Sequence, residues 1–417
     1  MDNFATGFLL INAIAIIVLP RRWAPLPFLI GVCYVTRFQR LIIGPFTFTI
    51  LRMLVAVGFA RVLIRCERLE GRLNGLDKLM LAWAGWMLIS SVFHKDPSAA
   101  LVFRLGLVYD ACGIYFLLRV FFRTLDDVKN LCRITAVVLL PVAIEMLYEK
   151  VTVHNLFSAL GGGPESPALR EGHIRAQGPF AHAILAGTVG AVTLPLMVGL
   201  WNEHRRIAIV GMISCATMIV TCASSGPILS AIAAIGALYM WHFKDRLRMV
   251  RWLAFLSYVF LDIIMKDPAY YVMARIDLAG GSTGWHRARL IQSSMEHLAE
   301  WWLAGTDYTR HWMASGVSWS PEHTDITNHY LQLGVVGGIP LILLFIAILL
   351  KGFSIVGHLQ REEGQLPSGA QFMIWALGAS LFAHAVTFIS VSYYDQSFLF
   401  IYLTLAAIGS AGSVIRI

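Results

Sequence analysis

Polar residues that can exchange protons gather immediately before an apolar run in the last third of the chain. Residues 320–339 read SPEHTDITNHYLQLGVVGGI, so a polar stretch containing His323, Asp325 and His329 leads directly into an apolar segment. His and carboxylate side chains are common proton-transfer groups in enzymes. This order of residues predicts chemistry at the surface of a membrane.

Arginines in the preceding segment suit an anionic ligand. Arg275, Arg287, Arg289 and Arg310 all lie between residues 266 and 328, near predicted helix beginnings. Helix N-termini offer free N–H groups and a positive dipole end, and Arg adds a charge with several hydrogen-bond donors. The cluster predicts a phosphate-binding site. The competing interpretation is that these arginines neutralise acidic neighbours and lipid headgroups.

Aromatic residues are concentrated in the same segment. Five of the twelve tryptophans fall there, namely Trp285, Trp301, Trp302, Trp312 and Trp319. Aromatic rings anchor proteins at a membrane interface, or offer flat apolar faces to sugar rings beside an active site. Either role places the segment against the membrane.

The elements that position these residues are predicted to be membrane-spanning helices. The chain is 57% hydrophobic and 14% charged, with a mean hydropathy of +0.67, outside the usual range of soluble domains. Apolar runs of about 20 residues, long enough to cross a bilayer as helices, recur along the sequence. We expect an all-α polytopic membrane protein with about 12 or 13 transmembrane helices.

The predicted organisation has three parts. Residues 1–265 form transmembrane helices with a first outer loop at about 150–179, residues 266–328 form a large extracytoplasmic loop, and residues 329–417 form the C-terminal transmembrane helices. The clearer spans are 45–64, 79–94, 98–118, 131–149, 180–200, 207–223, 225–242, 251–265, 329–350, 372–390 and 397–415. The topology of the first 36 residues is open, and no signal peptide is expected.

Basic residues indicate the orientation. The net charge of +8 comes largely from Lys and Arg clustered near residues 61–78, 119–133 and 244–251, which are alternate connections and should be cytoplasmic. Both long loops then lie outside the cytoplasm, and a loop of about sixty residues exceeds what a passive connection needs. This distribution favours contact with membrane lipids and argues against a nucleic-acid partner.

Other common kinds of site leave no pattern in the sequence. The six cysteines lie in or beside apolar segments, with no CxxC arrangement, and no GxxxxGK[ST] motif for nucleotide phosphates is present. We therefore expect no metal site and no cofactor.

The large loop is predicted to be a helical subdomain. Ser282 or Thr283 can cap a helix that begins near Gly284 and ends at Gly305. A second helix is predicted to begin at Ser320, with Pro321 in its first position, and Asp325 is a candidate cap of the following membrane helix.

Charged side chains within predicted spans should face protein or a watery cavity. Arg104 and Asp110 are six residues apart on one predicted helix, so they point to different faces, and each should pair with another span. Arg52 lies within an earlier span. His182 and His384 are interpreted as core residues.

The pattern resembles the bacterial O-antigen ligase and Wzy-type polysaccharide polymerase superfamily, in its exopolysaccharide-polymerase-like branch. Arg175 in RAQGPFAH matches an outer-loop Arg ahead of a Gly-Pro-Phe stretch, and the Ser-rich TCASSGP at residues 221–227 follows. Arg287, Gly305 and the Asn-x-Tyr-Leu stretch at 328–331 match a later Arg in a Trp-bearing helix, a following Gly and the start of a membrane helix.

Two positions depart from that family. Gly226 and Pro227 follow the Ser pair where the ligases usually have Arg, and Thr327 stands where they usually have the catalytic His. His323, Asp325 and His329 are the replacements we consider. His329 lies two residues beyond Thr327, about 200° round an α-helix, whereas His323 could share its face. Asp325 has the competing role of helix cap.

The resemblance implies a metal-independent inverting glycosyltransferase in the bacterial inner membrane, acting at the periplasmic face. The donor would be a glycan on undecaprenyl diphosphate, and the acceptor a hydroxyl of another glycan or of a lipid. Other polysaccharide-assembly proteins are expected partners. By resemblance, Arg175 and Arg287 bind the diphosphate, with Arg289 and Arg310 as weaker candidates, and Thr327, Asn328 and Tyr330 support the site.

Three functions remain open at this point. Polymerisation of exopolysaccharide or O-antigen repeat units ranks first. Transfer of finished glycan to a lipid A-core or protein acceptor, as in O-antigen ligases, ranks second. A lipid-linked glycan flippase or another transporter would also contain buried charges, but it would not need a long polar loop rich in Arg and Trp.

Overall fold

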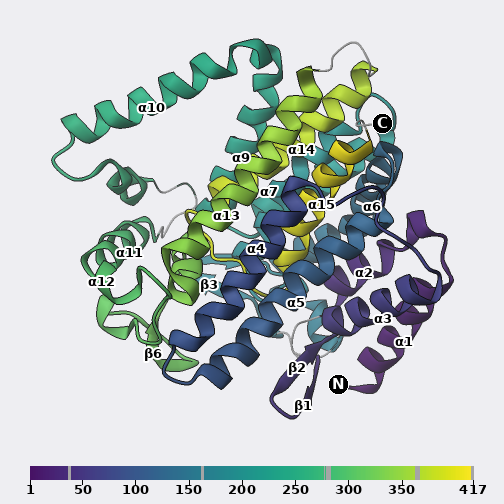
Figure 1. Ribbon diagram of the computed structural model, residues 1–417, viewed down its shortest axis with the longest axis horizontal. Coiled ribbons are helices and arrows are strands. Elements are labelled where there is room, and N and C mark those ends of the chain that lie inside the picture. Colours follow the sequence, from purple (N-terminus) through teal and green to yellow (C-terminus); the bar gives the residue numbers. More distant parts are fainter. Residues whose placement is uncertain (36–38, 161–163, 277, 279–282, 362–366, 415–417) are drawn as a thin grey trace.

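The chain folds almost entirely into helices (Figure 1). The computed structural model describes residues 1–417 except 36–38, 161–163, 277, 279–282, 362–366 and 415–417. The α-helices are α1 (Asn3–Val18), α2 (Leu26–Tyr34), α3 (Ile50–Ile64), α4 (Gly75–Ile89), α5 (Pro97–Phe121), α6 (Leu125–Thr152), α7 (Ala183–Gly199), α8 (Arg205–Thr221), α9 (Ser225–Tyr239), α10 (Leu247–Ile264), α11 (Gly284–Glu296), α12 (Leu298–Trp301), α13 (His329–Arg361), α14 (Ser368–Thr387) and α15 (Phe398–Val414).

Short elements join these helices. The described residues form three antiparallel hairpins: β1 (Arg40–Ile43) with β2 (Phe46–Thr49), β3 (Ala168–Arg170) with β4 (His173–Arg175), and β5 (Gly316–Val317) with β6 (Ser320–Thr324). The 3-10 helices are η1 (Arg21–Trp23), η2 (Ser90–Phe93), η3 (Leu156–Leu160), η4 (Met240–Arg246), η5 (Ala269–Arg275), η6 (Arg310–Trp312) and η7 (Asp395–Ser397).

The helices have the length and composition of a membrane protein. In the described part of the chain, five are long and apolar enough to cross a bilayer, at Gly75–Phe93, Pro97–Phe121, Leu125–Thr152, His329–Arg361 and Ser368–Thr387. Shorter apolar helices include α1, α7 and most of α15. The mostly helical structure is therefore consistent with the predicted all-α membrane protein, and five of the predicted spans coincide with helices long and apolar enough to cross a bilayer. The first predicted span differs at its start, because residues 46–49 form strand β2.

Helix α7 is almost wholly buried and packs against α8, α9 and α14. Glycines allow the close approach, because a Cβ on Gly187 would lie 2.3 Å from the Cys222 sulfur and one on Gly190 would lie 2.8 Å from the Cys215 carbonyl oxygen. This packing holds the turn between α8 and α9, which contains the Ser pair, against the first turns of α7.

Buried charges pair between helices. Arg52 of α3 forms an ion pair with Asp110 of α5 at 2.7 Å, and Arg119 of α5 forms one with Asp77 of α4 at 3.1 Å. As the sequence predicted, Arg104 and Asp110 each contact another segment. Pairing satisfies charges that would be costly to leave alone in an apolar interior.

Helix α13 is kinked where it meets the rest of the molecule. Gly337 and Gly338 have non-helical backbone angles, and Pro340 has no N–H with which to bind the Val336 carbonyl. Arg104 donates to that carbonyl instead, and the Trp86 indole N–H donates to the Gly337 carbonyl at 2.7 Å. The carbonyls freed by the kink are thus bound by side chains of α4 and α5.

The same kink anchors the described residues of the range 269–328, which we call the loop subdomain. The Thr306 N–H donates to the Val335 carbonyl at 2.9 Å, and the Ile339 N–H donates to the Trp302 carbonyl at 2.7 Å. Leu290, Trp301, Trp312, Met313 and Ile326 form its apolar core together with Val335 of α13. The subdomain is therefore joined to α13 by backbone hydrogen bonds and by a shared core.

Three local predictions for this region were wrong. Ser320 and Pro321 begin strand β6 and not a helix, because Ser320–Thr324 pairs with Gly316–Val317. Asp325 does not cap α13, since that helix begins at His329 and Asn328 accepts the Leu331 N–H at 3.1 Å. The predicted helix that begins at Gly284 breaks at His297 into α11 and α12.

The residues predicted to cap the helix that begins at Gly284 have different outcomes. Thr283 precedes α11 but makes no side-chain cap hydrogen bond, and Ser282 lies outside the described residues. Gly305 ends the helical segment with a φ of +94°, as expected for a glycine terminator.

Helix α10 stands apart from the bundle in Figure 1 and has no buried residue. Its main described contacts are with η4 and η5, the elements that precede and follow it. The exposed apolar side chains of this helix face the surrounding medium, which for a membrane protein includes lipid.

Candidate functional site

Arg175 lies at the centre of the candidate site. It ends strand β4, and its guanidinium donates to the Ser224 hydroxyl just before α9. Its side chain is 8% exposed, and its Nε has no hydrogen-bond partner among the described residues. A buried guanidinium with a free N–H donor is suited to bind an anionic ligand.

The backbone that follows Arg175 is fixed by an acidic side chain. The N–H groups of Gln177 and Gly178 donate to one carboxylate oxygen of Glu149, at 2.9 and 2.8 Å, and the Asn155 side chain donates to the Gly178 carbonyl at 2.9 Å. Helix α6, which carries Glu149, therefore positions the Arg-bearing strand. The hydrogen bonds to Glu149 and from Asn155 thus fix the backbone conformation of the RAQGPF stretch.

Arg170 joins Arg175 through the β3–β4 hairpin. Ala168 pairs with Arg175 and Arg170 with His173. Paired residues and residues two apart on a strand point to the same side of a hairpin. Arg170 and Arg175 therefore share one face. Glu171 and Gly172, both with positive φ, form the tight turn.

Arg287 reaches the same place from the loop subdomain. It lies near the start of α11, and its Nε donates to the Ser390 carbonyl at 2.9 Å. A Cβ added to Gly226, in the first turn of α9, would lie 3.6 Å from the Ser390 hydroxyl. The start of α9 therefore lies beside Ser390, whose carbonyl accepts from Arg287. It also follows Ser224, whose hydroxyl accepts from Arg175.

The electrostatics indicate that Arg170, Arg175 and Arg287 lie near one another. Burial lowers the pKa of Arg287, the charge of Arg170 lowers it further, Asp325 raises it and Arg175 lowers it. Burial followed by the charge of Arg170 also lowers the pKa of Arg175. No carboxylate in the described part of the chain is within ion-pair distance of these three arginines. The cluster, Arg170, Arg175 and Arg287, therefore carries positive charge that a bound anion would offset.

His182 borders the cluster at the start of α7. Its Nδ1 accepts the Ile184 N–H at 3.1 Å, so the ring caps the helix. Burial, together with the charges of Arg175 and Arg170, lowers the pKa of His182 to about 4. The imidazole is therefore neutral at pH 7, and the predicted core residue is instead a helix cap beside the arginines.

The candidate bases have three different environments. Asp325 has an exposed side chain, close enough to Arg287 to affect its pKa. His323 lies on β6, with Nδ1 2.8 Å from the Ser320 hydroxyl and its ring beside Trp319. His329 is 4% exposed, accepts the Tyr393 N–H at 3.3 Å and is surrounded by aromatic rings. Asp325 is thus the candidate base that the structure links to the arginine cluster.

The predicted supporting residues lie around the start of α13. The Asn328 side chain caps the helix, and the Tyr330 hydroxyl donates to the Ala385 carbonyl at 3.0 Å. The Thr327 hydroxyl oxygen is buried and has no hydrogen-bond partner in the described residues. Asn328 and Tyr330 make structural contacts here.

The other two predicted arginines lie in different surroundings. Arg289 forms an ion pair with Glu296 at 3.4 Å. Arg310 donates to the Met313 carbonyl at 2.7 Å and packs against Gly316, so it braces its own turn. No hydrogen bond or ion pair among the described residues links either side chain to Arg175 or Arg287. Conversely, Arg170 and His182 were missed as site residues, although Arg170 lies within the predicted first loop.

Comparison with known proteins adds no identification. No protein-family model matches the sequence, and no curated protein was found that is similar to it. The family resemblance of the sequence therefore stays a prediction.

Proposed function

We propose that the chain is a membrane glycosyltransferase that moves a glycan from undecaprenyl diphosphate to a hydroxyl group of a second glycan. The observation that carries the proposal is the meeting of Arg170, Arg175 and Arg287. These arginines come from two segments far apart in the sequence and have no carboxylate ion-pair partner among the described residues. A diphosphate matches such a cluster in charge and in hydrogen-bonding geometry. The proposal includes about 12 or 13 spans, an inner-membrane location and a periplasmic site.

The proposed reaction uses the cluster to stabilise a leaving group. The acceptor hydroxyl oxygen attacks the anomeric carbon of the donor sugar, and the bond from that carbon to the diphosphate oxygen breaks. The electron pair leaves with the lipid diphosphate, whose growing negative charge the arginines stabilise. Asp325 takes the proton of the attacking hydroxyl. The leaving group supplies the activation, so this step needs no metal.

Exposed aromatic residues of the loop subdomain support a glycan substrate. Trp285, two residues before Arg287, is 62% exposed, and Trp319, beside His323, is 75% exposed. Indole faces of this kind stack on the apolar faces of sugar rings. Trp301 and Trp312 are instead buried in the core of the subdomain.

The first prediction concerns Arg287. Purified protein in proteoliposomes, given undecaprenyl-diphosphate-linked repeat units with EDTA present, should produce longer lipid-linked glycan. Arg287→Ala should lower the rate by about 100-fold or more, the usual cost of losing one preorganised donor to a developing anion. Product length and rate are measured by gel analysis of labelled glycan.

Arg289→Ala is the matched control, because Arg289 lies two residues further along α11 and pairs with Glu296. It should retain activity close to wild type. An equal loss in both variants would contradict the assignment of Arg287. Intact substrate that merely changes leaflet would replace the transferase proposal with a flippase, and transfer exclusively to a lipid A-core acceptor would favour a ligase.

A further inference from the structure

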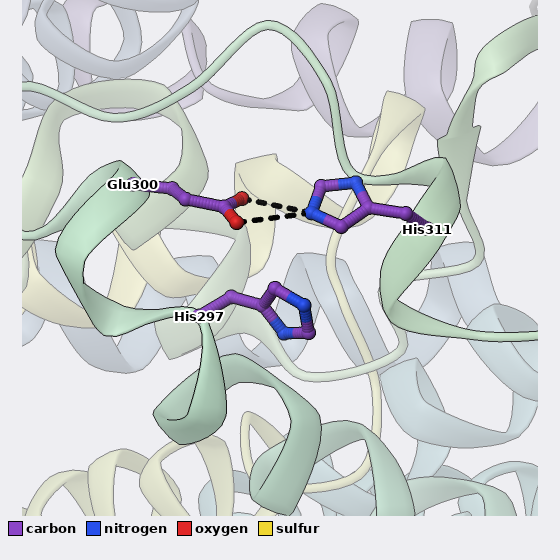
Figure 2. Close-up of side chains that lie close together, drawn as sticks. All are labelled: His297, Glu300 and His311. Carbon is purple, nitrogen blue, oxygen red and sulfur yellow. Dashed lines mark hydrogen bonds and ion pairs between the residues drawn. The ribbon is translucent and has the colours of Figure 1, made fainter.

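Three side chains able to bind a metal ion meet at the opposite end of α11 from Arg287. His297 and Glu300 lie at the junction of α11 and α12, and His311 comes from η6 (Figure 2). One donor atom from each residue lies within 4.8 Å of the others. The sequence predicted no metal site, because His311 follows on a separate turn and the three residues form no familiar motif.

The donor spacing resembles that around a tetrahedral ion. The His311 Nε2 lies 2.9 and 3.1 Å from the two carboxylate oxygens of Glu300. Bonds of about 2.0 to 2.1 Å to a tetrahedral zinc ion place neighbouring donors about 3.3 Å apart. A His–Glu ion pair alone would also give the observed contact, but it would not require His297 to face the same point.

Each of the three side chains is held in position by a neighbour. The His297 Nδ1 lies 2.8 Å from the Ser293 carbonyl, which can only accept, so Nδ1 carries the proton and Nε2 keeps a free lone pair. The Trp312 indole N–H donates to Glu300 at 3.2 Å, and Tyr308 stacks on the His311 ring at 5.0 Å. Such outer contacts are typical of metal-binding His and carboxylate groups.

The position suggests a structural role. His297 is ten residues beyond Arg287, which corresponds to about 15 Å along the helix. An ion there would lie too far away to act on a diphosphate bound by Arg287. It would instead join the α11–α12 junction to η6, and the exposed Glu300 and His311 side chains leave room for a water ligand.

We propose that His297, Glu300 and His311 bind a Zn²⁺ ion, with water as the fourth ligand, and that the ion stabilises the loop subdomain. Two imidazoles and one carboxylate suit zinc, whereas Mg²⁺ and Ca²⁺ prefer oxygen ligands. This inference does not depend on the proposed transferase activity.

The test measures Zn²⁺ binding by the full chain in detergent. Tag-free protein is stripped with EDTA, desalted and titrated with Zn²⁺ in competition with a chromophoric chelator. We expect one tight site. His297→Gln and His311→Gln should each weaken it by more than the about 10- to 100-fold that loss of an outer contact costs. His286→Gln, a histidine of the same subdomain outside the cluster, should bind like wild type.

Two further measurements distinguish the loss of a metal ligand from misfolding of a variant. Trp312→Phe keeps an aromatic ring but removes the donor to Glu300, so it should weaken binding by about 10-fold. Zn²⁺ should raise the thermal midpoint of wild type and of His286→Gln but not that of His311→Gln. Equal affinity in wild type and in the folded ligand variants, or no tight site in wild type, would overturn the proposal.

Failure of this inference is distinct from failure of the proposed function. Glycan transfer is expected in EDTA, so loss of zinc should lower stability and leave the chemistry in place. A wild type that binds Zn²⁺ but transfers no glycan would support the metal site and contradict the transferase.

Discussion

His182 couples the charge of the arginine cluster to the stability of the fold. Its Nδ1 must be unprotonated to accept the Ile184 N–H, and burial with the nearby arginines lowers its pKa to about 4 from a usual 6.5. Unfolded chains take up this proton below pH 6.5, whereas the folded chain resists it until near pH 4. The stabilising contribution is therefore present above that window and is lost as the pH falls through it.

We predict that His182→Asn reduces this loss, because Asn keeps a cap acceptor but has no titrating group. Thermal midpoints in detergent, measured from about pH 7.5 to about pH 4, should fall less steeply for the variant. Other groups that titrate in the same range change the thermal midpoints of both proteins alike, so their effect cancels in the comparison. Superimposable profiles for the two proteins would show that His182 is not responsible.

At the same scale, residue types predicted part of the site. Arg175 and Arg287 were identified from their positions ahead of a Gly-Pro-Phe stretch and within a Trp-bearing helix, and the structure brings them together. Arg170 was missed because a sequence does not show that a hairpin turn at Glu171 and Gly172 places it on the same face as Arg175. Arg289 was included because spacing cannot reveal its ion pair with Glu296.

Among the elements, the kink of α13 determines where the loop subdomain sits. A Cβ on Gly305 would lie 2.2 Å from the Val335 carbonyl oxygen, and the φ of Gly305 is +94°. A Cβ on Gly338 would likewise lie 2.2 Å from the Leu303 carbonyl oxygen. These backbone contacts leave no space for a side chain at either position.

Gly305→Ala should therefore destabilise the protein by at least about 1 to 3 kcal/mol, the cost of an unfavourable backbone conformation, with the clash in addition. Proteolysis of the loop subdomain should become faster than in wild type. Gly357→Ala, at a helical position of α13 with nothing within 4 Å of the new Cβ, is the control and should be neutral or slightly stabilising. Equal susceptibility of the two variants would argue against the anchor.

Element prediction failed where pairing overrode local signals. Ser320 followed by Pro321 is a good helix start, yet Ser320–Thr324 pairs with Gly316–Val317 and forms a strand. The five long apolar helices lie where spans were predicted, since their length and composition follow directly from the requirement to satisfy the backbone within an apolar medium, whereas the predicted number of about 12 or 13 spans stays a prediction. The polar subdomain depends on contacts between residues distant in sequence, which no local pattern contains.

For the whole molecule, α10 raises the question of what covers the exposed apolar side chains of a helix that stands apart from the bundle. Phe255, Leu256, Phe260 and Ile263 are all exposed, and no residue of the helix is buried. We predict that these side chains contact lipid. A Phe260→Cys variant labelled with a polarity-sensitive dye should emit as in an apolar environment in liposomes.

Cys66→Ser serves as the background, since Cys66 is the exposed cysteine of the chain. Ser318→Cys, on the exposed turn between β5 and β6, is the matched control and should report water. Dye at position 260 that reports water as strongly as dye at position 318 would contradict lipid contact by α10.

The hydrogen bond from Arg287 to the Ser390 carbonyl also has a consequence for biosynthesis. The two residues are 103 positions apart in the sequence. At a translation rate of about 5 to 20 residues per second, Arg287 emerges roughly 5 to 20 s before its acceptor exists. The Arg287 guanidinium therefore has no Ser390 carbonyl to bind while α13 and α14 are being synthesised, and this hydrogen bond forms only after both helices have been made.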